Sequence, residues 1–422
     1  MRISLVGVNH RTAPIDVREK AAIRSEELKK YLSLLSNHVS HGIILSTCNR
    51  TEVYIAENDG QDIDKAGLSF FQNYLNIPDA DLERCAYVIT RQQAVAEHLF
   101  RTTCGLDSLI IGEYEVLGQV GNALETAEQA GMVNLPLRHF FQGAIRTGRR
   151  VREETGISKN ALSVSSVAVD LAARIIGNLK DSRLLIIGTG EAGRLVAKAS
   201  KDRGVTQIAV ASRTMERAAE LAGMLGGKPV AMFSLAEEMV TCDIVVGCAS
   251  APHAIVDAAI IEGVMKHRPD SPLVIIDIAV PRNVADNVKD LKNVFLYNVD
   301  NLTEISDANR KLREDEITRT EEIIRAELDE LTEWWHGLET RPAVSALMEK
   351  AEAIRSTQLN STLKKLRPLS QEEQDYLDAM TKSIVVKILK DPLHYIKNNS
   401  AGNGDGNELI RQLFRLEVEN PE

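Results

Sequence analysis

Apolar and polar positions alternate in three different ways along this chain. Up to residue 155, short apolar runs of strand length are mixed with segments in which apolar residues recur at helical spacing. Between residues 156 and 301 the two patterns alternate regularly, as in strand–helix repeats, and from residue 302 onward the pattern is helical only. We therefore predict three domains, with bounds 1–155, 156–301 and 302–422.

The first segment predicts a compact α/β domain. One expected helix is capped by Ser25 and carries Glu26 and Glu27 in its first turn. Further helical patterns cover residues 62–75 and 91–131, the second interrupted around Cys104-Gly105 and at Gly112. The expected strands are 2–9, 42–47, 52–56 and 87–89.

The second segment contains the clearest fold signal. An apolar strand at 183–187 runs directly into a glycine-rich turn, and a helical pattern follows. The turn has the spacing G-x-G-x-x-G and consists of Gly188, Thr189, Gly190, Glu191, Ala192 and Gly193. Such glycines let the backbone approach a pyrophosphate at the helix N-terminus, which predicts a Rossmann-type, doubly wound domain. A glycine-rich turn that binds no dinucleotide is the alternative.

The strand that follows indicates which dinucleotide would bind. It covers residues 207–211 and ends at Ser212, Arg213 and Thr214. A site for NAD would place a carboxylate here to bind the ribose 2′-hydroxyl, yet residues 203–215 contain none. Arg213 suits a 2′-phosphate instead, so we predict NADPH as the cofactor. Apolar runs at 243–246 and 273–277 continue the parallel sheet.

The third segment predicts an all-α domain on a long helix. Residues 304–335 contain neither Gly nor Pro and predict one charged helix about 50 Å long at 1.5 Å per residue. We expect a break at Arg341-Pro342, then helices at 344–366 and 370–390, the second opened by a capping box of Ser370 and Glu373. Residues 400–407 are expected to form a flexible loop before a short last helix. These helices favour homodimerisation.

Composition excludes several classes of protein. The 422 residues include five widely spaced cysteines without a C-x-x-C pair. This argues against a disulfide framework and against a structural metal site. It favours a location in the cytoplasm. No apolar run approaches the length of a membrane span. The net charge is −10, most of it in the C-terminal segment, so contact with nucleic acid would need a local basic patch.

Residues 138–152 form such a patch, because they contain five arginines and no carboxylate. The arginines are Arg138, Arg146, Arg149, Arg150 and Arg152. Guanidinium groups bind phosphates, so this segment is a candidate phosphate-binding surface. A solvated helix face balanced by Glu153 and Glu154 explains the pattern equally well.

The candidate chemistry centres on Cys48. It follows the predicted strand 42–47 within the stretch Ser46-Thr47-Cys48-Asn49-Arg50, so its thiol is expected in a loop at a strand end. Arg50 could lower the pKa of the thiol and pair with a substrate carboxylate. An inert small cysteine is the alternative. His98 lies on a predicted helix, where a histidine is more often packed or solvated than catalytic.

Together these segments closely resemble the glutamyl-tRNA reductase family over essentially the whole chain. The motifs that carry the resemblance lie at 9–14 (Asn-His-Arg-Thr-Ala-Pro), 46–50, 105–108 (Gly-Leu-Asp-Ser), 112–113, 117–119 (Leu-Gly-Gln), 188–193, 277–282 (Asp-Ile-Ala-Val-Pro-Arg) and 297–300 (Tyr-Asn-Val-Asp). The resemblance implies NADPH-dependent reduction of glutamyl-tRNA(Glu) to glutamate-1-semialdehyde, the first step of tetrapyrrole synthesis from glutamate. It also implies a homodimer held by C-terminal helices and a product-receiving partner, glutamate-semialdehyde aminomutase.

The resemblance also implies roles for individual residues. Cys48 is the nucleophile that forms a thioester, and His98 matches a histidine that the activity requires. The substrate-binding residues are Thr47, Asn49, Arg50, Ser108, Glu113 and Gln119, together with Tyr114 and Glu115. At 112–115 the family usually reads Gly-Glu-Pro-Gln, so Tyr114 and Glu115 depart from its pattern. Ser212 also replaces a more frequent asparagine.

Two other functions remain open from the residues. One is a thiol-dependent NADP semialdehyde dehydrogenase that acts on a free small metabolite. The other is a catalytically silent NADP-binding scaffold that holds tRNA or the aminomutase. The arginine-rich segment and the long helix favour a macromolecular substrate, and the intact Cys48-Asn49-Arg50 argues against a silent scaffold.

Overall fold

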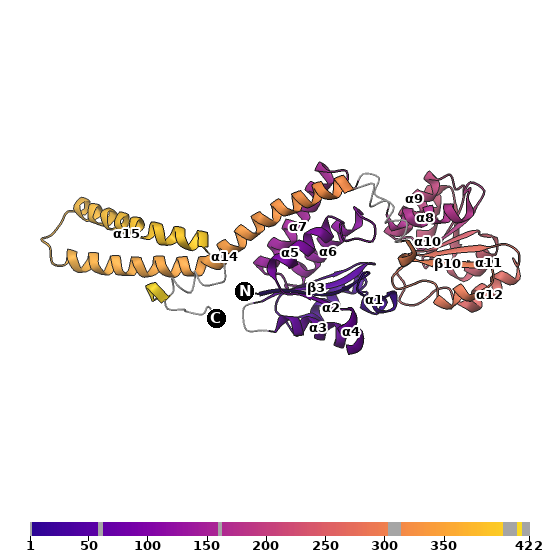
Figure 1. Ribbon diagram of the computed structural model, residues 1–422, viewed down its shortest axis with the longest axis horizontal. Helices are drawn as coiled ribbons and strands as arrows, with labels where there is room; N and C mark the ends of the chain where they lie inside the picture. Colours follow the sequence, from indigo (N-terminus) through magenta and orange to yellow (C-terminus); the bar gives the residue numbers. More distant parts are fainter. Residues whose placement is uncertain (1, 58–61, 159–162, 303–313, 400–411, 416–422) are drawn as a thin grey trace. The chain divides into compact units, whose positions relative to one another are not determined.

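The computed structural model describes residues 2–57, 62–158, 163–302, 314–399 and 412–415. Contacts divide the chain into two compact units, residues 1–327 and 328–422. Among the described residues, the first unit contains two sheets, and the second contains helices and no strand (Figure 1). The predicted fold class is therefore confirmed. Among the described residues, no helix combines the length and the apolar character that a membrane span requires.

The first sheet is antiparallel, with strand order β2-β3-β1-β4. Its strands are β1 (Arg2–Asn9), β2 (Gly42–Ser46), β3 (Arg50–Glu57) and β4 (Tyr87–Ile89), close to the predicted ranges. Strand β3 is buried along its whole length, because it lies between two partners and is covered on both faces.

Helices cover both faces of this sheet (Figure 1). On one face lie α2 (Leu28–Leu35) and α3 (Ile63–Tyr74), which contact β2 and β1. On the other lie α5 (Gln92–Thr103), α6 (Glu115–Gln129) and α7 (Leu135–Glu154). Two short helices, α1 (Ile15–Ala21) and α4 (Asp79–Cys85), were not predicted. At seven residues each, they are too short to show a helical period.

The predicted cap at Ser25 is wrong. Residues Ser25–Glu27 form a 3-10 turn, η1, whose N-cap is Arg24, and the α-helix begins only at Leu28. The Arg24 guanidinium forms ion pairs with Glu26 and Glu27 at 3.2 Å and 2.8 Å. The two carboxylates are thus held by a cation rather than placed in the first turn of a longer helix.

The second sheet is parallel, with strand order β10-β9-β8-β5-β6-β7. Its strands are β5 (Arg183–Ile187), β6 (Gln207–Ser212), β7 (Lys228–Ala231), β8 (Ile244–Gly247), β9 (Leu273–Asp277) and β10 (Val294–Asn298). Leu184 and Ile186 pack in one apolar cluster, and Leu185 and Ile187 in another, so both faces of the sheet are covered. This is the doubly wound arrangement expected from the sequence.

The helices of this domain follow the strands as strand–helix repeats require. They are α8 (Val164–Ile176), α9 (Glu191–Asp202), α10 (Met215–Leu225), α11 (Leu235–Thr241) and α12 (Ala258–Lys266). Three short 3-10 turns, η2 (Met232–Ser234), η3 (Asp286–Asp290) and η4 (Val299–Leu302), complete the domain.

The long helix α14 (Glu314–Leu363) runs through Pro342, so the predicted break at this proline is wrong. An interior proline removes a backbone hydrogen bond at a cost of about 3 kcal/mol. Packing beyond it offsets this cost, because Leu347 contacts α15 (Gln371–Asn399) through Leu389. The capping box is confirmed: Glu373 accepts from the Ser370 backbone at 2.8 Å. The predicted helix start at 304 and the loop 400–407 lie outside the described residues.

Candidate active site

Cys48 lies at the tip of the hairpin that joins β2 to β3. The hairpin is closed by the pairing of Ser46 with Thr51 and by a hydrogen bond from the Thr47 backbone to the Arg50 carbonyl at 2.8 Å. The Thr47 hydroxyl accepts from the backbone N–H groups of Asn49 and Arg50 at 3.1 Å and 3.2 Å. These bonds fix the loop, so the thiol has a defined position at the end of two paired strands.

The surroundings of Cys48 disfavour the thiolate in the free protein. Burial raises the pKa of the thiol well above its usual value, and the nearby carboxylates of Glu113 and Glu115 raise it further. The guanidinium of Arg18, which donates to the Cys48 carbonyl at 3.2 Å, acts in the opposite direction. The cation that opposes the rise is therefore Arg18, on α1, and not Arg50 as the sequence led us to expect.

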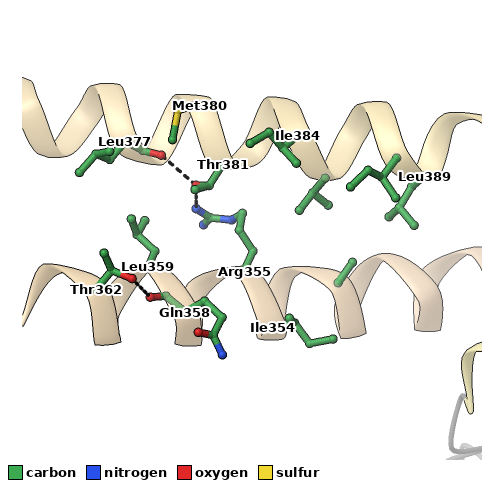
Figure 2. A pocket seen from close by; sticks show the side chains of 13 residues that line it. Ile354, Arg355, Gln358, Leu359, Thr362, Leu377, Met380, Thr381, Ile384 and Leu389 are labelled. Atoms are coloured by element: carbon green, nitrogen blue, oxygen red, sulfur yellow. Dashed lines mark hydrogen bonds between the residues drawn. The ribbon is translucent and has the colours of Figure 1, made fainter.

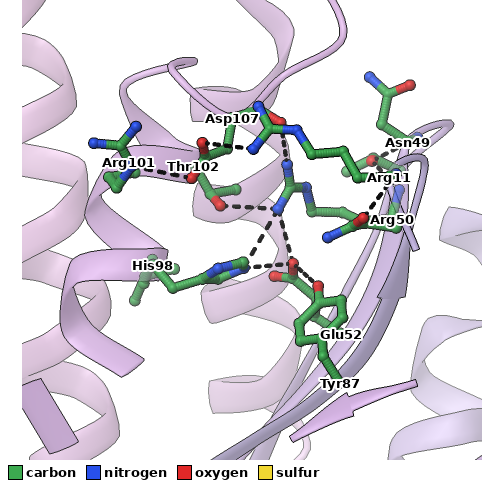
Figure 3. A network of polar contacts seen from close by, with 12 residues as sticks. Arg11, Asn49, Arg50, Glu52, Tyr87, His98, Arg101, Thr102 and Asp107 are labelled. Carbon is green, nitrogen blue, oxygen red and sulfur yellow. Dashed lines mark hydrogen bonds and ion pairs between the residues drawn. The ribbon is translucent and has the colours of Figure 1, made fainter. Parts of the chain in front are cut away.

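Arg50 instead belongs to a buried polar network (Figure 3). Its Nη1 donates to Glu52 at 2.8 Å and to Thr102 at 3.0 Å, and its Nη2 donates to the Asp107 carbonyl at 2.6 Å. The guanidinium is thus fixed by β3, by α5 and by the segment that follows α5.

Glu52 is the centre of this network, and sequence reasoning missed it. Its fully buried carboxylate also accepts from the hydroxyls of Tyr54 at 2.6 Å and Tyr87 at 2.5 Å. Burial alone would raise the pKa of Glu52, but the charges of His98 and Arg50 hold it well below its usual range. The only signal in the sequence is a carboxylate at the start of an otherwise apolar strand.

His98 projects from α5 into the same network (Figure 3). Its Nε2 lies 2.8 Å from Glu52 Oε1 and 3.4 Å from Arg50 Nη1. The centroid of its ring lies 5.6 Å from the centroid of the Tyr87 ring. The family resemblance implies that the activity requires His98. Its contacts are with Glu52, Arg50 and Tyr87, so any action on the thiol passes through Arg50 and the hairpin.

The segment between α5 and α6 and the first turns of α6 supply the other predicted substrate residues. Ser108 is buried and forms a side-chain hydrogen bond with the carboxyl group of Glu113. Burial raises the pKa of Glu113. Glu115 begins α6, and its pKa is raised to about 7 by burial and by the charges of Glu113 and Glu191. Gln119 lies one turn further along α6. The hairpin, Ser108, Glu113 and Glu115 thus form one site.

Two buried polar atoms at this site have no hydrogen-bond partner among the described residues. They are the side-chain oxygen of Asn49 and Nδ1 of His10. Burial and the charges of Arg50, Arg11 and Arg18 lower the pKa of His10 to about 4. Three guanidinium groups thus act on this position, against the charge of Asp107, and they favour binding of a substrate carboxylate here.

The glycine-rich turn has the close packing that a dinucleotide-binding turn needs. Gly188 has a φ of +121°, and a Cβ there would lie 2.8 Å from the backbone of Ala249. A Cβ on Gly193 would lie 2.2 Å from the Gly188 carbonyl oxygen. Helix α9 begins directly after Gly190 without a side-chain cap, so its first N–H groups are available to an anion.

The residues after β6 also fit the predicted cofactor. The hydroxyl of Ser212 lies 3.3 Å from that of Thr189, which joins the end of β6 to the glycine-rich turn. Arg213 and Thr214 are exposed at the carboxyl end of the strand. Within the part of the chain that the structure describes, Arg213 forms no ion pair. Its guanidinium is thus available to a phosphate.

The arginine-rich segment lies on α7 and is divided by its contacts. Arg138 and Arg150 form ion pairs with glutamates, and Arg152 donates to backbone carbonyl oxygens. Arg146 and Arg149 are exposed and, among the described residues, form no ion pair. These two remain the candidates for phosphate binding. Within the same residues, no group of His, Cys, Asp or Glu side chains could hold a metal ion.

A Rossmann-type domain joined to a domain with a positioned thiol defines an oxidoreductase of the dinucleotide-binding class. Three family models match successive parts of the chain. Residues 6–155 match the N-terminal domain of glutamyl-tRNAGlu reductase, residues 170–305 match shikimate/quinate 5-dehydrogenase, and residues 319–416 match the dimerisation domain of glutamyl-tRNAGlu reductase. The chain belongs to the glutamyl-tRNA reductase family, which confirms the resemblance.

Individual relatives are similar in sequence to this chain over almost its full length. The glutamyl-tRNA reductase of Natranaerobius thermophilus is 40% identical over 99% of this chain and 93% of its own. That of Bacillus subtilis is 36% identical over 99% of this chain and 92% of its own. Among solved structures, the enzyme from Methanopyrus kandleri is 33% identical, with 96% of this chain and 99% of that chain covered and a TM-score of 0.49.

Proposed function

We propose that this protein reduces glutamyl-tRNA(Glu) to glutamate-1-semialdehyde, with release of the tRNA, as the first step of tetrapyrrole synthesis from glutamate. The observation that carries the proposal is the hairpin tip. There the charges of Glu113, Glu115 and Arg18 act on Cys48, and three arginines, Arg11, Arg18 and Arg50, act on the neighbouring His10. The reductant proposed is NADPH, because the glycine-rich turn fits a pyrophosphate and Arg213 is free to bind a 2′-phosphate.

The thiol supplies covalent catalysis. The sulfur of Cys48 attacks the ester carbonyl, the ribose oxygen of the tRNA leaves with a proton, and a thioester remains on the protein. When bound, NADPH supplies the hydride that reduces this thioester. The resulting thiohemiacetal collapses to the aldehyde and frees the sulfur of Cys48. The ester already activates the carboxyl group, so the step needs no ATP.

The thiol must lose its proton, and nearby carboxyl groups are available to accept it. Glu115 is one of the two groups that raise the pKa of the thiol, and its own pKa is raised to about 7. A base with a pKa near the working pH is the most efficient proton acceptor. Arg18 stabilises the thiolate that results. In this proposal Arg50, held by Glu52, positions the hairpin and binds the substrate.

Tritium transfer tests the function against its two alternatives. The protein is incubated with tritiated NADPH and either glutamyl-tRNA(Glu), uncharged tRNA with free glutamate, or free small acyl metabolites. Tritium in glutamate-1-semialdehyde only from the charged tRNA supports the proposal. Transfer to a free metabolite would favour a semialdehyde dehydrogenase, and tRNA binding without any transfer would favour a scaffold.

His98 is predicted to act through the network rather than only to pack α5. The His98→Asn variant is expected to slow acylation of Cys48 by about 10²-fold, because the loss of its contacts with Glu52 and Arg50 misplaces the hairpin that carries the thiol. Single-turnover acylation by glutamyl-tRNA, run beside a thermal melt, is the measurement. An unchanged acylation rate in a variant with a lower Tm would assign His98 to packing alone.

Arg213 is predicted to determine cofactor preference. The Arg213→Asp variant is expected to lose about tenfold to several hundredfold in NADPH affinity, because it removes a charge-assisted contact to the 2′-phosphate. Fluorescence titration with NADPH and NADH measures the change. Arg217→Asp, one turn along α10 and also exposed, is the matched control and should bind NADPH normally. An equal loss of NADPH affinity in both variants would instead indicate general repulsion between the added carboxylate and the phosphates of NADPH.

We propose that the second copy in the homodimer covers an apolar groove of the helical unit, between α14 and α15 (Figure 2). Ile354, Met380 and Ile384 line this groove, and each exposes about half of its surface. Exposed apolar surface of this extent is typical of an interaction site. Arg355 bonds Asp378 at 2.7 Å and Thr381 at 3.0 Å across the groove, which fixes how the two helices pair.

The remaining proposals concern the protein's surroundings. The aldehyde product is reactive, so a partner that receives it directly would protect it, and the family resemblance makes glutamate-semialdehyde aminomutase the expected partner. All five cysteines are free. A mechanism that needs a reduced thiol fits the cytoplasm.

A further inference from the structure

Tyr114 is an exposed aromatic residue held at the thiol site. It lies between Glu113 and Glu115, the two carboxyl residues whose charges act on Cys48. Glu113 is buried and bonded to Ser108, whereas Tyr114 exposes 59% of its surface. A large aromatic side chain is therefore presented to solvent one residue away from the groups that surround the nucleophile.

The backbone that carries Tyr114 is rigid. Gly112 adopts a φ of +81°, and a Cβ there would lie 2.1 Å from the Ile157 carbonyl oxygen. The Gly112 carbonyl oxygen accepts from the Ser158 hydroxyl at 3.0 Å. Helix α6 begins immediately after Tyr114. The turn and the helix together fix where the ring leaves the chain.

Arg152 supports the ring. Its guanidinium carbon lies 5.8 Å from the Tyr114 ring centroid, within the range of a cation–π contact. The guanidinium is itself fixed, because it donates to the carbonyl oxygens of Gly148 at 2.8 Å, Glu113 at 3.0 Å and Thr103 at 3.3 Å. The pair is thus an aromatic surface with a cation behind it, the combination on which nucleic-acid bases stack.

We propose that Tyr114, supported by Arg152, stacks on the base of the terminal adenosine that carries the glutamyl ester. This inference rests on the proposed function. The ester joins the amino acid to the ribose of that nucleoside, so the base must lie close to the nucleophile when the ester carbonyl reaches Cys48. Stacking reads no sequence, which suits a 3′-terminal adenosine that all tRNAs share.

Two small esters separate recognition of the nucleoside from recognition of the glutamyl group. The full-length protein is acylated without NADPH by 3′-O-glutamyladenosine or by the α-methyl ester of glutamate, and the thioester is measured by intact mass over time. The ratio of the two second-order rate constants of acylation reports the contribution of the nucleoside. We expect a ratio well above one for the wild-type protein and for Tyr114→Phe, which keeps the ring.

In Tyr114→Ala this ratio is expected to fall at least about fivefold, the lower limit for loss of one stacked base. Tyr31→Ala is the matched control, because Lys30 lies over the Tyr31 ring at 5.6 Å in the same domain and away from the site. Its ratio should not change. A Tyr114→Ala variant that loses rate equally with both esters, or a wild-type ratio near one, overturns the stacking. Failure of the wild-type protein to be acylated by glutamyl-tRNA(Glu) itself would overturn the proposed function instead.

Discussion

Semialdehyde formation is expected to fall by on the order of 10³-fold or more when Cys48 is replaced by serine. A serine hydroxyl is almost wholly protonated near pH 7, and an ester accepts hydride less readily than a thioester. The surroundings of residue 48 strengthen this expectation, because burial and the carboxylates of Glu113 and Glu115 oppose any anion at the hairpin tip. The measurement is product formation from glutamyl-tRNA and NADPH by the purified Cys48→Ser variant.

Two controls accompany the Cys48→Ser variant. Its NADPH binding should match that of the wild-type protein, since the glycine-rich turn belongs to another domain. Cys85→Ser changes a buried thiol at the end of α4, and its turnover per folded molecule should be normal. Near-normal turnover of Cys48→Ser would remove the thiol from the mechanism.

Loss of the Glu52 carboxylate is expected to have the largest effect on stability. In Glu52→Gln the buried guanidinium of Arg50 loses its counter-charge, and breaking such a buried pair costs about 3–5 kcal/mol. The glutamine amide keeps one acceptor oxygen in place of two, so either Tyr54, which donates to Oε2, or His98 and Tyr87, which contact Oε1, lose their acceptor. The measurement is the free energy of unfolding in urea at pH 7, compared with the wild-type protein.

The pH dependence of this loss follows from the direction of the pKa shift. The pKa of Glu52 is lowered in the folded state, so its contribution to stability is fully present above the unfolded value of 4.5 and is lost as the pH falls below it. The difference between wild type and Glu52→Gln should therefore be constant from about pH 8 to pH 5.5 and narrow only in stronger acid.

Glu57→Gln is the matched control for this experiment. Glu57 lies on the same strand and is also buried, but it accepts from the backbone N–H of His41 at 2.7 Å, lies 3.4 Å from the Nδ1 of the same residue and, among the described residues, accepts from no arginine. An amide oxygen can replace that acceptor, so a small loss is expected. If Glu52→Gln is no less stable than Glu57→Gln, Arg50 is satisfied by Thr102 and the Asp107 carbonyl alone.

The sequence alone determined those features that depend on local periodicity and on backbone conformation. The strand at 183–187, the glycine-rich turn and the following helix were predicted together, because only glycine tolerates the close approach at Gly188 and Gly193. The capping box at Ser370 was also predicted, because a cap depends on residues three positions apart. Cys48 was placed at a strand end for the same kind of reason.

Only the tertiary structure decided which distant charges meet. Arg18 and Arg50 are both arginines within reach of the hairpin, yet the first lies against the Cys48 carbonyl and the second against Glu52. The network around Glu52 joins β3, β4 and α5, whose order in the sheet and packing no local pattern encodes. The helix boundary predicted at Pro342 was wrong for a related reason. The local cost of the proline is offset by packing between Leu347 and Leu389, which lie far apart in the sequence.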